Sequence, residues 1–356
     1  MEQQKGLQQS RLAYADLLRV AALIAVIVLH VCGNNWQGEE ITSLNWKILN
    51  VLDSLVRWCV PVFVMLSGMF FLDPKRKVTY RSIFGKNLLR VATAFVAWSV
   101  FYALFTALLA WRGGTPETPM QIWLDVVYGH YHLWFLYMIM GLYLVTPILR
   151  KFVEGASRRD LEYFLALYFI FTLLMPAFHG VPGLQVIGNV SYRMDVKSLA
   201  GYVGYFVAGY YLKTYDFKPR TKRIIYLLGL LGALCTIVFT WLSSVAWEAP
   251  NEKWYQYFTP NVGLMAFGIF LFFKEKATGA RLKPRALAWF TKVSQLSFGI
   301  YLVHAFFNNR LVGLGLDAVT FNPLIAVPLA TVLVFAASYL TIWLLSKIPL
   351  FRKYCM

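Results

Sequence analysis

Long apolar stretches, each bounded by charged residues, proline or glycine, recur along this chain of 356 residues. A membrane-spanning helix needs about 20 consecutive, mostly apolar residues. The composition agrees, because 59% of the residues are hydrophobic and 14% are charged, whereas soluble domains carry about 25% charged residues. These features exclude an ordinary soluble enzyme and predict an all-α integral membrane protein.

The apolar stretches predict a single bundle of about ten transmembrane helices. The expected spans lie near 12–32, 48–72, 84–110, 130–149, 160–178, 196–213, 222–246, 257–274, 291–310 and 322–347. No internal repeat or low-complexity linker separates them, so we expect one domain over 1–356. No small-residue cleavage site follows the first apolar run, which predicts an uncleaved first span.

The basic residues predict the orientation of this bundle. The chain carries 34 Lys and Arg against 17 Asp and Glu, and most of the basic residues fall on one set of alternate loops. Since cytoplasmic loops are enriched in Lys and Arg, we expect both termini on the cytoplasmic side. The formal charge of +17 therefore reflects topology in a lipid bilayer, and we expect no nucleic acid partner.

Four cysteines, Cys32, Cys59, Cys235 and Cys355, are scattered along the chain. They show no paired spacing and no histidine at ligand distance. The sequence therefore predicts neither a disulfide framework nor a metal site.

Two arginines, Arg19 and Arg57, fall inside expected spans. A charge at the centre of a membrane helix is costly and normally faces a protein interior or a watery cavity. Arg19 lies three residues after Asp16, and Arg57 lies four residues after Asp53, so each arginine could instead form a structural ion pair on its own helix. Both interpretations stay open.

Histidines supply a second group of polar residues within the apolar stretches. His30 follows Arg19 by 11 residues, which is about three helical turns or about 16 Å, so the two side chains share one helix face. In the expected topology His30, His132 and His304 lie in the middle or outer half of the membrane. Imidazole is suited to proton transfer near neutral pH, although a membrane histidine also serves as an interhelical hydrogen-bond donor. For His130 and His179 we favour that ordinary structural role.

Four motifs in order resemble acyltransferase family 3. They are Arg19-x10-His30, Val60-Pro-Val-Phe-Val-Met-Leu-Ser67-Gly68, Tyr131-His132-Leu-Trp134-Phe-Leu and Ser297-Phe-Gly-Ile-Tyr301-Leu-Val-His304. The resemblance covers essentially the whole chain and includes the ten-span plan. It is strongest to the enterobacterial common antigen O-acetyltransferase type. Many members carry Trp-Ser-Leu-x-x-Glu at the place where this chain has Trp134 to Ile139, which contain no acidic residue. The carboxylate role of that glutamate therefore cannot be assigned in this span. His132, which precedes Trp134, is expected to have a different function.

The resemblance implies a bacterial inner-membrane enzyme that uses acetyl-CoA. The acceptor would be a hydroxyl of a cell-surface glycan or of its lipid-linked precursor. Lys86, Arg90 and Arg81 would bind the phosphates of CoA. Alternatively, these residues only reflect the general enrichment of basic residues on the cytoplasmic side. The pantetheine arm would then pass Arg19 on its way to His30.

At the outer end we expect His30 to act as general base on the acceptor hydroxyl. Arg57 is the first candidate for the hydrogen-bond donor to the oxyanion, and His304 and Ser67 are weaker candidates. His30 could instead be acetylated in a two-step reaction. Asp53 would either orient His30 or pair with Arg57.

The main alternative function is a secondary transporter or exporter of a lipid-linked sugar or small molecule, because buried charges also build transport pathways. Transporters often show inverted repeats and interrupted helices, and neither is evident in this sequence. The tryptophans in or beside the outer loops, Trp247 and Trp254 among them, are expected to form an interfacial belt. The oligomeric state is not predicted.

Overall fold

The computed structural model describes residues 2–179, 181, 183–194, 196–277 and 282–355, and this part of the chain is helical with no strand. The longer helices are α1 (Glu2–Trp36), α5 (Leu89–Arg112), α7 (Trp134–Gly155), α11 (Val196–Thr214), α12 (Pro219–Trp247), α13 (Pro260–Lys276), α14 (Pro284–Gly313) and α15 (Pro323–Leu345). Shorter helices are α2 (Leu44–Ser54), α3 (Cys59–Phe71), α4 (Tyr80–Ser82), α6 (Pro119–Tyr128), α8 (Arg158–Tyr168), α9 (Met175–Ala177), α10 (Gln185–Met194) and α16 (Pro349–Tyr354).

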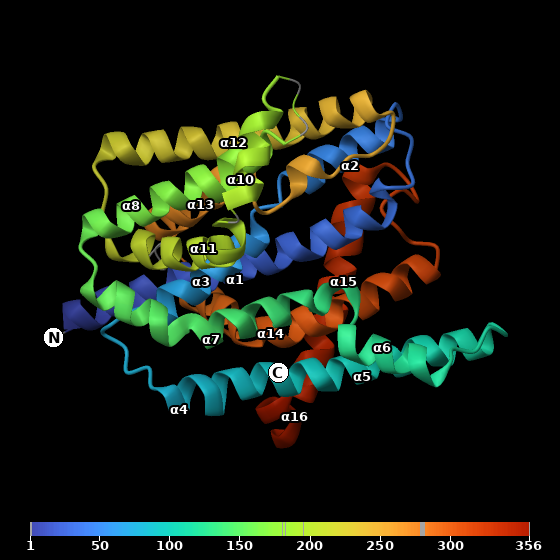
Figure 1. The fold of residues 1–356 in the computed structure, drawn as a ribbon. Helices are drawn as coiled ribbons and strands as arrows, with labels where there is room; N and C mark the ends of the chain where they lie inside the picture. The colour runs from blue at the N-terminus through green and yellow to red at the C-terminus, as the bar shows by residue number, and fades with distance from the viewer. Residues whose placement is uncertain (1, 180, 182, 195, 278–281, 356) are drawn as a thin grey trace.

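Most of the long helices lie side by side along one common direction, and α15 runs across them at a steep angle (Figure 1). Within the described residues, eight stretches are long and apolar enough to cross a membrane. They are Ala13–Trp36, Leu44–Phe71, Tyr80–Arg112, Pro119–Gly155, Arg158–Ala177, Pro219–Trp247, Lys253–Lys276 and Pro323–Leu345. The protein is thus an all-α, multi-pass membrane protein, as predicted.

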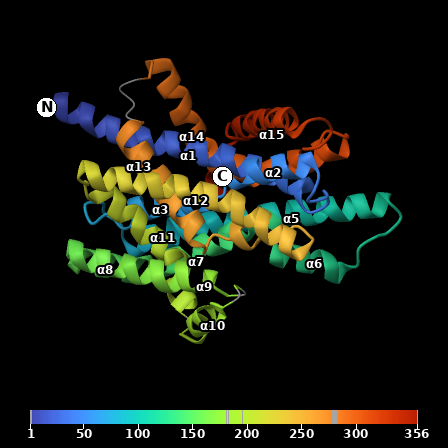
Figure 2. The same cartoon turned by 90° about the horizontal axis from the view of Figure 1, so that it is seen from above.

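The expected spans near 196–213 and 291–310 correspond to α11 and α14, which are not among those eight stretches. The count of ten spans therefore stays a prediction. The N-terminal end lies at one end of the bundle, and the C-terminal end lies midway along it (Figures 1 and 2). The expectation that both ends are cytoplasmic also stays a prediction.

The span expected at 48–72 is not one continuous helix. It is divided into α2 and α3, and residues 55–58 form turns between them. Pro61 lies in the first turn of α3, and a proline ring clashes with the carbonyl four residues earlier, so an unbroken helix through this point is disfavoured. The expectation of uninterrupted helices was therefore wrong here. The helical region expected at 130–149 is likewise preceded by α6 and a break at Gly129.

A glycine allows α3 and α11 to approach each other closely. A Cβ atom at Gly68 would lie 1.8 Å from the carbonyl oxygen of Phe206, and one at Gly209 would lie 1.9 Å from that of Met65. Small residues permit such close approach of membrane helices, where packing rather than water drives association. Gly68 in the Ser67-Gly68 motif is thus required by the backbone of the neighbouring helix.

The carboxyl end of α3 is held by two cations from other helices. Arg150 of α7 donates hydrogen bonds to the carbonyls of Phe71 and Asp73, at 2.7 and 3.0 Å, and Lys213 of α11 pairs with the Asp73 carboxylate. Burial acts to raise the pKa of Asp73, but hydrogen bonds from Lys213 and from the Lys75 backbone N–H outweigh it and hold the pKa below its usual value. Positive charge at a helix C-terminus also complements the helix dipole.

Candidate active site

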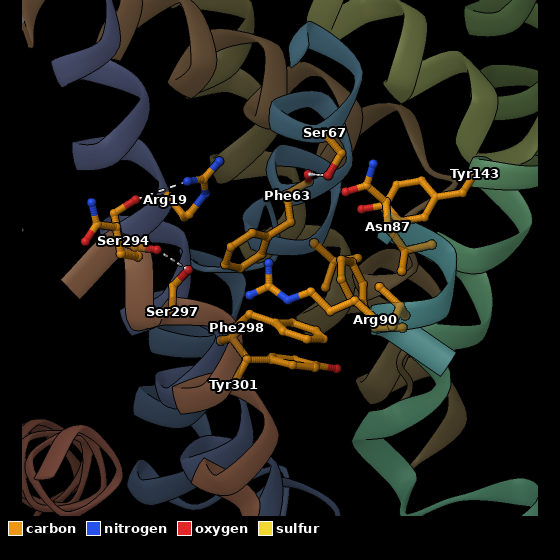
Figure 3. A pocket seen from close by; sticks show the side chains of 16 residues that line it. Arg19, Phe63, Ser67, Asn87, Arg90, Tyr143, Ser294, Ser297, Phe298 and Tyr301 are labelled. Carbon is orange, nitrogen blue, oxygen red and sulfur yellow. Dashed lines mark hydrogen bonds between the residues drawn. The ribbon is translucent and has the colours of Figure 1, made fainter. Parts of the chain in front are cut away.

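A cavity of about 310 Å³ lies between α1, α3, α5, α7 and α14. Its walls are mostly aromatic and aliphatic, with two guanidinium groups as the charged elements. Arg19 of α1 and Arg90 of α5 reach into it from opposite sides (Figure 3). The guanidinium of Arg90 lies over the ring of Phe298, 5.9 Å from the ring centroid, which is at the outer limit of about 6 Å for a cation–π contact. The cavity therefore combines an apolar channel with two fixed positive charges.

Arg19 is oriented by polar side chains of α14. Its Nη1 donates to Ser294 Oγ at 3.1 Å, and Ser294 in turn donates to Asp16 at 2.7 Å. The direct distance from Arg19 Nη1 to the Asp16 carboxylate is 3.9 Å, and Thr291 donates to the other oxygen of Asp16. Both interpretations of Arg19 therefore find support in the geometry, since it pairs with Asp16 and also lines the cavity.

Tyr301 lines the same cavity, and its carbonyl begins a chain of hydrogen bonds that ends at His30. The Tyr301 carbonyl accepts from His304 Nδ1, and His304 Nε2 lies 2.8 Å from His30 Nδ1. A carbonyl only accepts, so His304 carries its hydrogen on Nδ1, and in the neutral ring its Nε2 is an acceptor. His30 must then donate from Nδ1. This arrangement leaves the lone pair of His30 on Nε2.

A second pair of histidines, His132 and His130, is hydrogen-bonded to the carbonyl of Leu302, the residue after Tyr301 on α14. His132 Nε2 donates to the carbonyl of Leu302 at 3.2 Å, and His130 Nδ1 lies 2.9 Å from His132 Nδ1. The hydroxyl of Tyr102 also donates to the Leu302 carbonyl at 2.9 Å and accepts from the Phe306 backbone N–H at 3.2 Å. The Tyr102 hydroxyl thus hydrogen-bonds to the carbonyl of Leu302 and to the N–H of Phe306, which are four residues apart on α14.

The two histidine pairs adjoin each other. The rings of His132 and His304 are 5.2 Å apart between centroids, and Tyr131 packs edge-on against His30 at 5.4 Å. His132 and His304 are fully buried. The structure therefore brings together His30, His132 and His304, which the sequence had singled out separately, and adds His130.

From the sequence, His130 is expected to be an ordinary hydrogen-bonding histidine, and its contact with His132 is a hydrogen bond of that kind. The sequence does not predict that its partner is His132. Residues two apart do not share a face of an α-helix, so a helix starting at 130 would separate the two rings. Gly129 has φ of +73°, His130 is extended, and 131–133 form a 3-10 turn. The Gly-His-x-His sequence was the available signal, because glycine readily adopts this conformation.

Arg57 and Asp53 form an ion pair with each other. The guanidinium also lies 3.8 Å from the ring centroid of Tyr255, and Asp53 is fully buried. Among the described residues no hydrogen bond joins Asp53 to His30, so of the two alternatives the structure places Asp53 with Arg57. The Nε–H of Arg57 has no hydrogen-bond partner in the described part of the chain.

The remaining candidates separate by position. Arg90 and Ser67 line the cavity, and Ser67 Oγ donates to the Phe63 carbonyl at 3.0 Å. Arg81 and Lys86 are both exposed, and neither lines the cavity. His179 lies apart, where its Nδ1 is 3.0 Å from Asn189 Oδ1.

Comparisons with known proteins agree with the sequence motifs. The family model described as an acyltransferase domain matches residues 12–343. No curated protein and no solved structure matches the chain. Among the described residues no group of three or more His, Cys, Asp or Glu could hold a metal ion. Because the family model spans nearly all of the helical bundle, the chain belongs to acyltransferase family 3.

Proposed function

We propose that this protein is a bacterial inner-membrane O-acetyltransferase. It moves an acetyl group from cytoplasmic acetyl-CoA to a hydroxyl of a cell-surface glycan or of its lipid-linked precursor. The resemblance to the enterobacterial common antigen type makes that glycan the first acceptor to test. The observation that carries the proposal is the cavity, which extends from Arg19 and Arg90 to Tyr301, whose carbonyl holds the His304–His30 pair.

The cavity suits the narrow arm of acetyl-CoA rather than the whole molecule. Its volume of about 310 Å³ is at the small end of ligand pockets, and its walls are mainly apolar, like the pantetheine chain. The two guanidinium groups can bind phosphate or carbonyl oxygens. Arg90 and Arg19 therefore serve as donor-binding residues, whereas Arg81 and Lys86 would act only on parts of CoA that stay outside the cavity.

In the reaction, His30 Nε2 removes the proton of the acceptor hydroxyl as its oxygen attacks the thioester carbonyl. The C–S bond then breaks, the acetyl group stays on the acceptor oxygen, and the proton passes from His30 to the CoA thiolate. His304 accepts the hydrogen bond from His30 Nδ1–H throughout, so Nε2 of His30 is the nitrogen that takes up and releases the proton. Arg57, with an unpartnered Nε–H, is the candidate donor for the oxyanion.

The same lone pair would allow His30 to attack the thioester itself and form an acetyl-histidine. Rapid acid quenching of the protein with radiolabelled acetyl-CoA, before any acceptor is added, separates the two routes. Label that stays on wild-type protein and is absent from His30→Ala would indicate the two-step reaction, whereas unlabelled protein would indicate direct transfer.

The overall proposal is tested in membrane vesicles supplied with radiolabelled acetyl-CoA on the cytoplasmic face. We expect label in the glycan with wild-type protein and none with His30→Ala. The control variant Lys151→Ala, at an exposed position that does not line the cavity, should behave as wild type. Glycan that crosses the membrane without gaining label would instead indicate an exporter. Normal transfer by a folded His30→Ala protein would contradict the assignment of the base.

A further inference from the structure

A second cavity, of about 640 Å³, lies where α9, the end of α12 and the segment before α13 meet. Neither the proposed donor path nor the histidine pairs use it. The side chains that concern its chemistry are Ser243, Trp247, Asn251, Glu252, Trp254 and Gln256. Its volume lies within the range typical of small-molecule sites.

This cavity lies toward the histidine end of the bundle. Gln37, which follows α1, donates from Nε2 to Glu252. Gln37 comes seven residues after His30, in the direction away from Arg19, and seven helical residues span about 10 Å. Glu252 is therefore found beyond His30 and on the side opposite the donor-binding arginines.

Two aromatic contacts, linked by short stretches of chain, lie between the edge of the cavity and the histidines. Tyr257 directly follows Gln256 in the chain and stacks on Trp134, with ring centroids 5.9 Å apart and an interplanar angle of 24°. Trp134 lies three residues after Tyr131, which packs against His30. A ligand held in the second cavity is thus separated from the proposed base by few side chains.

The lining favours a neutral ligand that carries many hydroxyl groups. Indole rings offer flat apolar faces, and the amide and carboxylate groups of Asn251, Gln256 and Glu252 donate and accept hydrogen bonds in fixed planes. The two charged side chains of the lining, Glu252 and Lys253, are opposite in sign, so their net charge is zero. Each is already hydrogen-bonded, because Glu252 accepts from Gln37 and Lys253 Nζ donates to the His179 carbonyl at 2.7 Å. This lining contrasts with the paired guanidinium groups of the first cavity, which suit an anionic or carbonyl-bearing donor.

We infer that the second cavity binds a sugar unit of the acceptor glycan, with Trp254 and Trp247 stacking on the ring and Gln256 and Asn251 bonding its hydroxyls. The inference rests on the proposed function and specifies where its acceptor is held. Trp247 and Trp254 then do more than belong to an interfacial belt. The donor arm and the acceptor sugar would then occupy separate cavities, and the part of the glycan that reacts would extend from the second cavity toward His30.

The test measures binding and transfer separately. Wild-type protein in lipid nanodiscs is titrated calorimetrically with oligosaccharides released from the envelope of its native host, and the variants are Trp254→Ala and Gln256→Ala. We expect at least tenfold weaker binding by each variant. Trp123→Ala is the matched control, because Trp123 is an exposed tryptophan, 61% accessible, that does not line the cavity. Trp254→Phe, which keeps an aromatic face, should restore most of the affinity.

In the transfer assay the same variants should raise KM for the glycan and leave KM for acetyl-CoA unchanged. Wild-type affinity in both Trp254→Ala and Gln256→Ala, or no binding by wild-type protein, would overturn the inference. Intact, Trp254-dependent glycan binding by a protein that transfers no acetyl group would instead refute the proposed function and leave the sugar site standing.

Discussion

The hydrogen bond between His304 and His30 leads to a prediction about the rate of acetyl transfer. The predicted effect comes from the orientation of the His30 ring more than from its charge. His304→Ala removes the acceptor for His30 Nδ1–H. The imidazole of His30 is then free to rotate and to place its hydrogen on Nε2, which is the nitrogen that must be unprotonated for the proposed reaction. His304→Gln is the informative partner variant, because its side-chain oxygen reaches about as far as the lost Nε2 and can still accept.

The size of the effect follows from two contributions. A buried hydrogen bond of this kind contributes about 1 kcal/mol, which biases the two neutral forms of His30 about fivefold. Loss of the ring orientation adds about another tenfold, since small displacements of a catalytic group are costly. We therefore expect kcat/KM to fall about 10- to 100-fold in His304→Ala. Removal of the base itself in His30→Ala should cost more, about 10²- to 10⁴-fold.

The assay is acetyl transfer from radiolabelled acetyl-CoA to glycan in reconstituted vesicles, with thermal unfolding measured on the same preparations. Because His304 is fully buried, its truncation is expected to lower stability as well, and rates are compared below the unfolding transition of each variant. His304→Gln should recover a substantial part of the lost rate. KM for acetyl-CoA should change little, since His304 does not line the donor cavity.

Two results would refute this reasoning. Wild-type kcat/KM in a folded His304→Ala protein would show that the orientation of His30 does not depend on the pair. Equal losses in His304→Ala and His304→Gln, with unchanged thermal stability, would show that acceptance of the His30 proton is not what His304 provides.

Three further perturbations test other parts of the structure. Arg19→Ala should raise KM for acetyl-CoA about tenfold or more without altering the choice of acceptor. Arg112→Ala, at an exposed position that does not line the cavity, serves as its control, and equal values for both variants would remove Arg19 from the donor path. Gly68→Ala should destabilise the protein by about 3 kcal/mol or prevent folding, since overpacking against a backbone is costly. Gly141→Ala is its control, because a Cβ atom at Gly141 would have no neighbour within 4 Å, and this variant should unfold at the wild-type temperature. Folding lowers the pKa of Asp73, so its stabilising contribution is present above the unfolded pKa of about 3.9 and is lost as the pH falls through the folded pKa. Melting temperatures should therefore fall more steeply with acidification in wild type than in Asp73→Asn. The difference should stay below about 1 kcal/mol, because the partly exposed Asp73–Lys213 pair is still screened by solvent, and parallel pH profiles would contradict the effect.

Much of the helical plan was predictable from apolar stretches, because a membrane helix must satisfy its backbone internally and so leaves a continuous signal. The division of 48–72 into α2 and α3 was harder to predict. Pro61 was visible, but prolines also occur within membrane helices that stay helical, as Pro147 does in α7. Which outcome occurs depends on the packing around the proline, and the sequence alone does not specify that packing.

The candidate site was predictable in part for a similar reason. Arg19 and His30 share one helix, so their spacing alone placed them on one face. The contact of His30 with His304 joins residues 274 positions apart, and no local pattern encodes such a pairing. The contact of His130 with His132 was not predicted, because it depends on the backbone at Gly129, where the expected regular helix does not begin.

Helices α1 and α14 meet at two levels, through Arg19 with Ser294 and through His30 with His304. The two helices therefore run in the same direction, and the two contacts are 11 residues apart on one helix and 10 on the other. Each added residue turns the rest of a helix by about 100°. A single alanine inserted between the two levels of α1 would thus preserve hydrophobicity and length almost unchanged, yet would rotate His30 away from its partner while Arg19 stayed in place.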